Sequence, residues 1–183
     1  MKNRRSIRLK EYDYSQSGAY FITICTHERE GLFGEIKHGQ VVLSDAGEIA
    51  RAVWSELPGR FPLVRLDEYV IMPNHIHGIF FVGAQWIAPA HLVVPNPKYT
   101  MDRVHTLGEI IRTYKSTVTR LVRTRYDSDT NKGGMNPAPT SWFGWQRNYY
   151  EHVIRNEDEL NEIRQYIVDN PAKWDTDEEN PNE

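Results

Sequence analysis

The feature that most constrains the fold is the alternation, along the chain, of apolar segments typical of strands with segments whose apolar side chains have helical spacing. Residues 19–26 (AYFITICT) are rich in aromatic and β-branched side chains, as is typical of a buried strand. Across residues 46–57, apolar side chains instead recur every three or four positions, which predicts an amphipathic helix. Such alternation favours a fold in which helices pack against a sheet.

The remaining segments extend this alternation to the end of the chain. Ser44 and Asn156 are candidate N-caps of the first and last helices, while Pro58-Gly59 and Pro171 end the patterns of these helices. The turn residues Pro73-Asn74 favour antiparallel pairing of the strands on either side. The other expected segments are a hairpin over residues 32–37 and 40–43, strands over 66–72 and 77–82, a basic helix over 106–126, strand character over 142–154, a last helix ending near Asp169, and loops over 83–102 and 127–140.

This order of elements predicts the fold class. Without the hairpin and the last helix the order is βαββαβ, which is that of a ferredoxin-like α+β domain with an antiparallel sheet and helices on one face. We therefore expect that fold with an inserted β-hairpin and an additional C-terminal helix. Because ferredoxin-like sheets support many activities, function has to be inferred from particular residues.

Composition excludes several classes of protein. The single cysteine, Cys25, allows no internal disulfide and no thiolate metal site. The longest apolar runs are far shorter than the roughly 20 residues that cross a bilayer. The basic first ten residues lead into Glu11, Tyr12 and Asp13 rather than into the apolar stretch of a secretory signal. For 183 residues, we expect one domain in the cytoplasm with no membrane partner.

The net charge of -3 hides an uneven distribution of charge. Residues 175–183 contain acidic side chains and no basic ones, so the rest of the chain is slightly basic. We divide the chain into a basic N-terminal arm (1–14), one domain (15–174) and an acidic disordered tail (175–183). The alternative to a binding role for the basic segments is solvated surface. The candidate phosphate contacts for nucleic acid are Arg4, Arg5, Arg8, Arg112, Lys115, Arg120 and Arg123.

The most distinctive local motif is PNHIHGIF at residues 73–80. Because side chains alternate along a strand, His75 and His77 project from one face and Ile76 projects from the other face into the core. Two neighbouring imidazoles can ligate a divalent metal. Two ligands do not make a site, however, and a pair of partly buried, hydrogen-bonded histidines is the alternative explanation.

The last helix carries two further candidate groups. At 100° per residue, Leu160, Ile163 and Ile167 form its apolar stripe, and Tyr166 and Asn170 lie next to each other on the flank. The carbonyl oxygen of Asn170 can serve as a third ligand to a hard or borderline metal. A tyrosine beside an apolar stripe is usually a packing residue, so only the combination with the histidines favours a chemical role.

Two histidines, an amide and a phenol together indicate phosphodiester chemistry. A phenol with a pKa of about 10 is a poor nucleophile at neutral pH. A phosphodiester held on a divalent ion is an activated target, because the metal neutralises phosphoryl charge and aligns the group for in-line attack. The product would be a phosphotyrosine that conserves the phosphodiester energy and frees a sugar hydroxyl.

These residues resemble a known family. His75-Ile76-His77 is similar to the HUH motif, two histidines around a hydrophobic residue, of the IS200-like single-tyrosine (Y1) transposases. Residues 145–156 (WQRNYYEHVIRN), with Tyr166 and Asn170-Pro171, resemble the REP-associated tyrosine transposases of that group. The resemblance covers about residues 15–174, nearly all of the chain.

The resemblance implies a ferredoxin-like fold, Tyr166 as the nucleophile, and Mg²⁺ or Mn²⁺ bound by His75 and His77. It places Asn170 where the family has a polar third ligand on the tyrosine helix, often Gln. It also implies cleavage and transfer of single-stranded or hairpin DNA through a 5′-phosphotyrosine and a free 3′-hydroxyl. Both a homodimer and a monomer stay open.

Other residues compete with Tyr166 or support it. Tyr114 lies on the apolar stripe of the basic helix, where packing is its expected role. Tyr149 and Tyr150 are expected to be structural or to stack on bases, and Tyr150 and His152 are candidates to line the site beside the metal ligands. Two other functions stay open: a nucleic-acid-binding module without catalysis, and a metal-dependent phosphoesterase that activates water instead of tyrosine.

Overall fold

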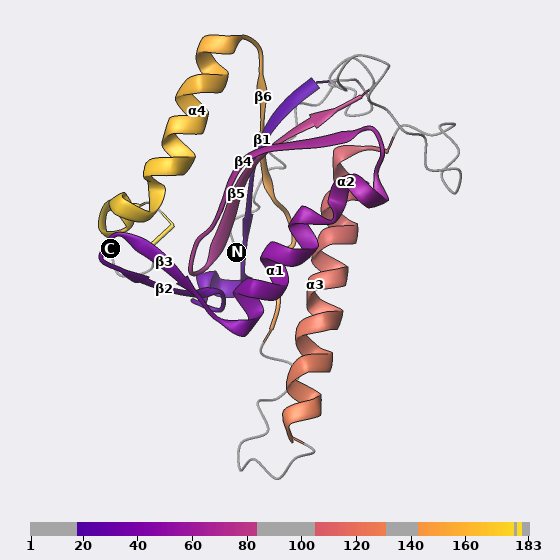
Figure 1. The fold of residues 1–183 in the computed structure, drawn as a ribbon, viewed down its shortest axis with the longest axis vertical. Coiled ribbons are helices and arrows are strands. Elements are labelled where there is room, and N and C mark those ends of the chain that lie inside the picture. The colour runs from indigo at the N-terminus through magenta and orange to yellow at the C-terminus, as the bar shows by residue number, and fades with distance from the viewer. Residues whose placement is uncertain (1–17, 84–104, 131–142, 178, 181–183) are drawn as a thin grey trace, which may run out of the picture.

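A four-stranded antiparallel sheet with strand order β4-β5-β1-β6 forms the centre of the molecule (Figure 1). The computed structural model describes residues 18–83, 105–130, 143–177 and 179–180. The sheet contains β1 (Gly18–Cys25), β4 (Val64–Ile71), β5 (His75–Val82) and β6 (Tyr150–Ile154). A separate hairpin contains β2 (Gly34–Lys37) and β3 (Gln40–Leu43).

Helices lie on both sides of this sheet. Figure 1 shows α1 (Asp45–Ser55) and α3 (Leu107–Thr130) on one side, and α4 (Glu157–Asp169) on the other. Short helical segments complete the described fold: α2 (Leu57–Arg60), the 3₁₀ helix η1 (His27–Arg29) and the 3₁₀ helix η3 (Asn170–Thr176). Without the hairpin and α4, the element order and strand order are those of a ferredoxin-like domain, which confirms the predicted fold class.

Polar caps fix where the helices begin. The Ser44 hydroxyl accepts a hydrogen bond from the Gly47 N–H at 3.2 Å, and the Asn156 side chain accepts one from the Glu159 N–H at 2.8 Å. At the start of α3, Thr106 and Glu109 bond reciprocally, each side chain accepting from the backbone N–H of the other. These contacts satisfy N–H groups that have no partner inside a helix.

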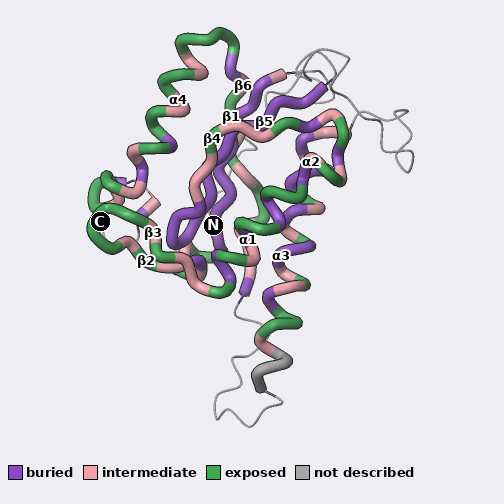
Figure 2. Tube along the Cα trace, in the orientation of Figure 1, coloured by how far each residue is buried: buried purple, intermediate pink, exposed green. Residues whose placement is uncertain are grey.

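The two faces of the sheet bury different kinds of side chain. Tyr20, Ile22, Ile24 and Ile76 belong to the large apolar cluster that α1 and α3 cover. On the α4 side, the buried apolar cluster is much smaller. Figure 2 shows the strands between these layers, of which β5 is buried along its whole length. The small apolar cluster contains Ala19, Ile79, Phe81, Ile154 and Ile167.

Several boundaries differ from those predicted. Pro58 does not end helical structure but lies in the first turn of α2, where its missing N–H costs nothing. The last α-helix ends at Asp169 as predicted, but the chain continues into η3, and Pro171 lies in the first turn of that segment. The α3 helix continues to Thr130, into the segment expected to be a loop, and regular strand structure in 142–154 is confined to β6.

The acidic segment after Trp174 also differs from the expected disordered tail. Asp177 and Asn180 are buried, and the backbone N–H of Asn180 donates to the Asp177 carbonyl at 2.9 Å. Glu179 forms an ion pair with Arg29 at 2.9 Å. Local turn bonds and this ion pair therefore hold residues that composition alone assigns to solvent.

Two segments predicted from the sequence lie outside the described residues. They are the basic arm, which contains Arg4, Arg5 and Arg8, and most of the loop expected over 83–102. Among the helices that the structure describes, none has the length and apolar character to cross a membrane.

Candidate active site

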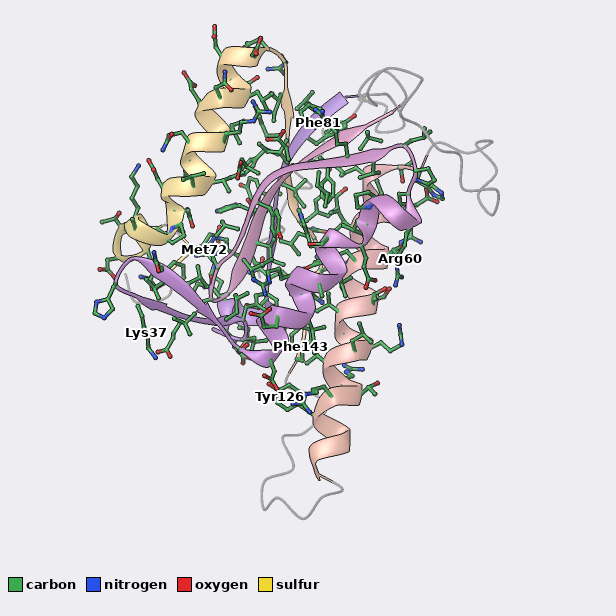
Figure 3. The ribbon with its side chains drawn as sticks, in the orientation of Figure 1. Lys37, Arg60, Met72, Phe81, Tyr126 and Phe143 are labelled. Atoms are coloured by element: carbon green, nitrogen blue, oxygen red, sulfur yellow. The ribbon has the colours of Figure 1, made fainter. Side chains whose placement is uncertain are left out.

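The predicted histidine pair lies at the start of β5, directly after the Pro73-Asn74 turn. The backbone N–H of Met72, labelled in Figure 3, donates to the His75 carbonyl at 2.8 Å and closes this turn. The rings of His75 and His77 lie side by side with centroids 4.4 Å apart. Ile76 points into the opposite cluster, as strand alternation predicts.

Hydrogen bonds orient His75 so that one ring nitrogen faces the site. The Asn74 amide nitrogen donates to the carbonyls of Glu179 at 2.7 Å and Arg29 at 3.2 Å, so its Oδ1 is the acceptor. His75 Nδ1 lies 2.8 Å from that oxygen and therefore donates to it. The proton thus resides on Nδ1, and His75 Nε2 is a buried lone pair with the Asn170 side chain within reach; since the Asn170 Oδ1 is also an acceptor, the two atoms cannot satisfy each other.

His77 is oriented by the neighbouring strand. Its Nδ1 lies 2.9 Å from the Thr23 hydroxyl, and the Ile22 backbone carbonyl also accepts from the ring. Since these contacts favour the proton on Nδ1, Nε2 again faces the site. The Tyr166 hydroxyl lies 3.3 Å from that Nε2.

Burial keeps both histidines uncharged. Desolvation lowers the pKa of His75 to about 3, and the positive charge of Arg29 adds to the shift. Desolvation and the neighbouring His75 lower the pKa of His77 to about 3, although the charge of Asp177 opposes this shift. Neutral imidazoles are the form in which histidine binds metal.

A third candidate ligand comes from the C-terminal segment rather than from α4. Ligand atoms of His75, His77 and Asp177 lie within 4.8 Å of one another, so this cluster could hold a metal ion. Asn170, the predicted third ligand, is buried beside Asp177 and donates to its Oδ2 at 2.7 Å through Nδ2. The Oδ1 of Asn170 is buried without a hydrogen-bond partner. Asp177 is not among the ligands predicted from the sequence because it lies in the segment whose composition suggests an acidic tail.

The donor set fits a divalent cation. His75 Nε2 and Asn170 Oδ1 are both buried acceptors without a hydrogen-bond partner, which is costly unless a cation or a proton donor meets them. A carboxylate and two neutral imidazoles suit Mn²⁺ and other divalent ions, and an amide oxygen is also acceptable to Mg²⁺. The residues therefore fit a divalent cation, and their chemistry alone does not select one ion.

Tyr166 combines access to solvent with contact to the cluster. Its side chain is 45% exposed, and its ring packs edge-on against Phe21 and His77 with centroid distances of 6.0 and 5.3 Å. Phe21 in turn stacks on His77 at 5.3 Å. Part of Tyr166 is thus open to solvent while aromatic contacts hold its ring against the cluster.

The other tyrosines occupy different environments. Tyr114 is buried on the opposite face, where its hydroxyl donates to the Ala50 carbonyl at 3.0 Å and burial raises its pKa well above the usual range. Tyr149 packs against the large apolar cluster. Tyr150 is 58% exposed on the edge strand and lies in register with Thr23, whose other partner is His77.

His152 does not join the ligand cluster. It lies in register with Phe21, and its Nε2 is 2.7 Å from Glu159 Oε1. This contact links β6 to the first turn of α4. His152 therefore supports the position of the helix that carries Tyr166.

The basic residues of α3 fall into two groups. Arg112, Arg120 and Arg123 are exposed on the layer opposite the histidines. Lys115 is instead partly buried and donates to the carbonyls of Gln146 and Asn148, each at 2.9 Å, and desolvation lowers its pKa to about 8. Lys115 thus ties α3 to the segment before β6, so it is not the exposed phosphate contact that the charge pattern suggested.

Comparison with known proteins yields one close sequence relative and a shared fold. No model of a known protein family matches the chain. A protein of Haemophilus influenzae, itself uncharacterised, is 39% identical over 179 residues, which are 96% of this chain and 92% of that protein.

Two solved structures align with nearly the whole chain. A REP-associated tyrosine transposase bound to a REP hairpin aligns with a TM-score of 0.52 at 19% identity, covering 95% of this chain and 74% of that one. A putative transposase from Deinococcus radiodurans aligns with a TM-score of 0.47 at 13% identity, covering 89% and 96% of the two chains. The first alignment supports the resemblance inferred from sequence at the level of the fold.

Proposed function

We propose, since the chain belongs to the same family as the Haemophilus influenzae protein and has the fold of a REP-associated tyrosine transposase, that it cleaves and transfers DNA strands through a phosphotyrosine at Tyr166. The observation that carries this proposal is the 3.3 Å distance between the Tyr166 hydroxyl and His77 Nε2. Among the described residues, one group of His, Cys, Asp or Glu side chains could hold a metal ion, and it contains His77 together with His75 and Asp177. Nucleophile and ligand cluster therefore meet on one face of the sheet.

Four residues would hold the metal. His75 and His77 would bind through Nε2 and Asp177 through a carboxylate oxygen, and Asn170, whose Nδ2 donates to Asp177, would add its Oδ1 as a ligand or as an acceptor for a bound water. A bound Mg²⁺ or Mn²⁺ would neutralise phosphoryl charge and align the phosphodiester for in-line attack. Asn74 and Thr23 fix the histidine rings before any ion arrives, which reduces the cost of binding.

The reaction balances without a further reactant. The Tyr166 oxygen forms a bond to the phosphorus of a DNA phosphodiester, and the bond from phosphorus to the 3′-oxygen breaks. The phenolic proton leaves to solvent, which the exposed ring edge permits, and the 3′-oxygen is released as a hydroxyl. Attack of a 3′-hydroxyl on the phosphotyrosine reverses these steps and joins strands.

The proposed substrate is single-stranded or hairpin DNA. The solved transposase is bound to a REP hairpin, and here the basic α3 adjoins the segment that leads into the edge strand β6. In this proposal, DNA phosphates contact Arg112, Arg120 and Arg123 on α3. The strand then runs along the β6 edge of the sheet, where unpaired bases stack on the exposed ring of Tyr150. The arm residues Arg4, Arg5 and Arg8 and the basic helix would thus position DNA without reading its sequence.

The proposed site is complete within one chain. His75 and His77 come from β5, Tyr166 from α4, Asn170 from the start of η3, and Asp177 directly follows η3. We therefore assign all five residues of the proposed cleavage step to one chain.

Denaturing gels after incubation with a single-stranded hairpin DNA and Mn²⁺ test this proposal. The expected product is a covalent protein–DNA band that disappears with chelator and in Tyr166→Phe, but persists in Tyr150→Phe, the matched control with an exposed tyrosine on the same face. Cleavage without a covalent band would instead indicate activation of water. A mobility shift without cleavage would indicate a binding module, and either result contradicts the proposal.

A further inference from the structure

One ion pair joins the helix that carries Tyr166 to the edge of the sheet. Arg164 of α4 donates to Asp67 of β4 through two bonds, Nε to Oδ1 at 2.6 Å and Nη2 to Oδ2 at 2.7 Å. A third bond runs from Nη1 to Asn161 Oδ1 at 3.0 Å, so three nitrogens of the guanidinium are engaged. We call the Asp67–Arg164 pair the α4 clasp.

The backbone of β4 is shaped to make this contact. Its register against β5 shifts between Leu66 and Tyr69, which places Asp67 and Glu68 in a bulge. Bulges turn a side chain away from the regular alternation of a strand. The Asp67 side chain is only 15% exposed, and the Arg164 bonds are the largest cause of its lowered pKa.

Apolar packing alone restrains α4 weakly. Ile167 is the only buried residue within α4, and Leu160 and Ile163 are only partly buried against the small cluster. The rotation of α4 therefore depends on polar contacts as well, which are the His152–Glu159 contact near its start and the α4 clasp. At 100° per residue, Arg164 and Tyr166 lie on opposite flanks of the apolar stripe.

Rotation matters because the hydroxyl lies far from the helix axis. An atom about 6 Å from the axis, roughly the radius of a helix with its side chains, moves about 1 Å when the helix rolls by about 10°. A misplacement of about 1 Å can cost about 100-fold in rate. The 3.3 Å contact between Tyr166 and His77 is therefore sensitive to a contact on the opposite flank of α4.

We propose that Asp67 and Arg164 are positioning residues, and that the α4 clasp sets the rotation of α4 so that the Tyr166 hydroxyl lies against His77. The catalytic consequence rests on the proposed function, whereas the placement of the ring does not. A merely stabilising ion pair would change the thermal midpoint without moving Tyr166.

The test uses full-length protein and two readouts. NMR contacts (NOEs) between the ring of Tyr166 and the rings of Phe21 and His77 report the position of the tyrosine in DNA-free protein. The single-turnover rate of adduct formation at saturating hairpin DNA and Mn²⁺ reports the chemical step. Thermal midpoints are measured for every variant.

Four variants separate position from stability. Asp67→Asn removes the charge, Arg164→Lys keeps the charge but removes the planar fork, and the double variant Asp67→Arg/Arg164→Asp exchanges the partners. Asp45→Asn is the control, because it breaks the Asp45–Arg125 pair at 3.1 Å, which joins α1 to α3 on the opposite face.

The α4 clasp predicts loss of the NOEs and about a 10- to 100-fold slower adduct rate in both single variants, recovery of both readouts in the exchange variant, and no change in the control. Unchanged NOEs in Asp67→Asn would overturn the proposal. An exchange variant that recovers the thermal midpoint but not the NOEs would also overturn it. If the NOEs behave as expected but wild-type protein forms no adduct, the clasp stands and the proposed function fails.

Discussion

The two faces of the sheet differ in what they bury. Against α1 and α3, the sheet packs large apolar side chains, and Trp54 sits so close to Gly78 that a Cβ there would lie 2.3 Å from the indole. On the α4 side, β5 contributes two histidines to a buried polar cluster, and the C-terminal segment adds the Asn170 amide and the Asp177 carboxylate. One face thus supplies most of the apolar burial that stabilises the fold, and the other carries the candidate chemistry.

We therefore expect substitutions on the apolar face to change mainly the stability of the fold, and substitutions on the polar face to change mainly metal binding and activity. Buried polar groups contribute less to stability than apolar ones and cost free energy when they lack partners. The polar face should therefore tolerate substitutions that abolish metal binding, whereas equivalent substitutions on the apolar face should unfold the protein.

The largest expected effect comes from placing the same polar side chain on each face of β5. Ile76→Asn loses a buried aliphatic side chain and buries an amide without partners, which we expect to cost about 4 kcal/mol or more of folding free energy. His77→Asn, one residue away, leaves an amide beside the Thr23 hydroxyl. Urea unfolding should show a far lower midpoint for Ile76→Asn only, and equal midpoints would contradict the contrast between the faces.

Removal of either histidine should abolish metal binding without unfolding the domain. We expect His75→Ala and His77→Ala to lower Mn²⁺ affinity by at least about 100-fold. Each variant deletes a ligand whose ring is held in place by a hydrogen bond, from His75 to Asn74 or between His77 and Thr23. Calorimetric titration with Mn²⁺ measures the affinity, and circular dichroism checks the fold. Full Mn²⁺ affinity in both variants would refute the metal assignment.

A smaller effect distinguishes Asp177 from Asn170. Asp177→Asn removes a charged ligand and should lower Mn²⁺ affinity by about 10- to 100-fold. Asn170→Ala should be milder, because water can replace a neutral amide ligand, although Asp177 loses the bond that orients it. The same titration ranks the two variants, and a larger loss in Asn170→Ala would favour the ligand predicted from the sequence.

The smallest effect concerns the exposed cations of α3. Replacing Arg120 and Arg123 together by Gln should weaken hairpin and scrambled DNA almost equally and reduce the slope of log K against log salt by about one to two units. Arg51→Gln with Lys37→Gln, exposed cations on α1 and β2, is the control. Binding titrations at several salt concentrations measure the slope, and identical slopes in all three proteins would remove α3 from the DNA-binding surface.

Sequence patterns predicted the parts of the molecule that depend on local periodicity. The side-by-side placement of His75 and His77 follows from strand alternation, and the helix starts at Ser44 and Asn156 follow from N-cap chemistry. Both rules operate within a few residues, so neither requires knowledge of the tertiary structure.

Features set by contacts between distant segments could not be predicted. Asp177 reaches the histidines from a segment whose composition suggests solvent, although Trp174, with its ring 6.0 Å from His75, is a signal that this segment packs. The charge pattern of α3 assigned Lys115 to phosphates, but the carbonyls that it binds come from residues about 30 positions later. Charge runs report the number of cations and not their neighbours.

Mass-spectrometric mapping of the covalent product tests the central claim most directly. Trypsin digestion of the adduct formed with hairpin DNA and Mn²⁺, followed by nuclease treatment, should leave a nucleotide on the peptide of residues 165–173, which contains Tyr166 and no other tyrosine. A nucleotide on residues 148–155, which contain Tyr149 and Tyr150, or no modified tyrosine in a protein that cleaves DNA, would contradict the account.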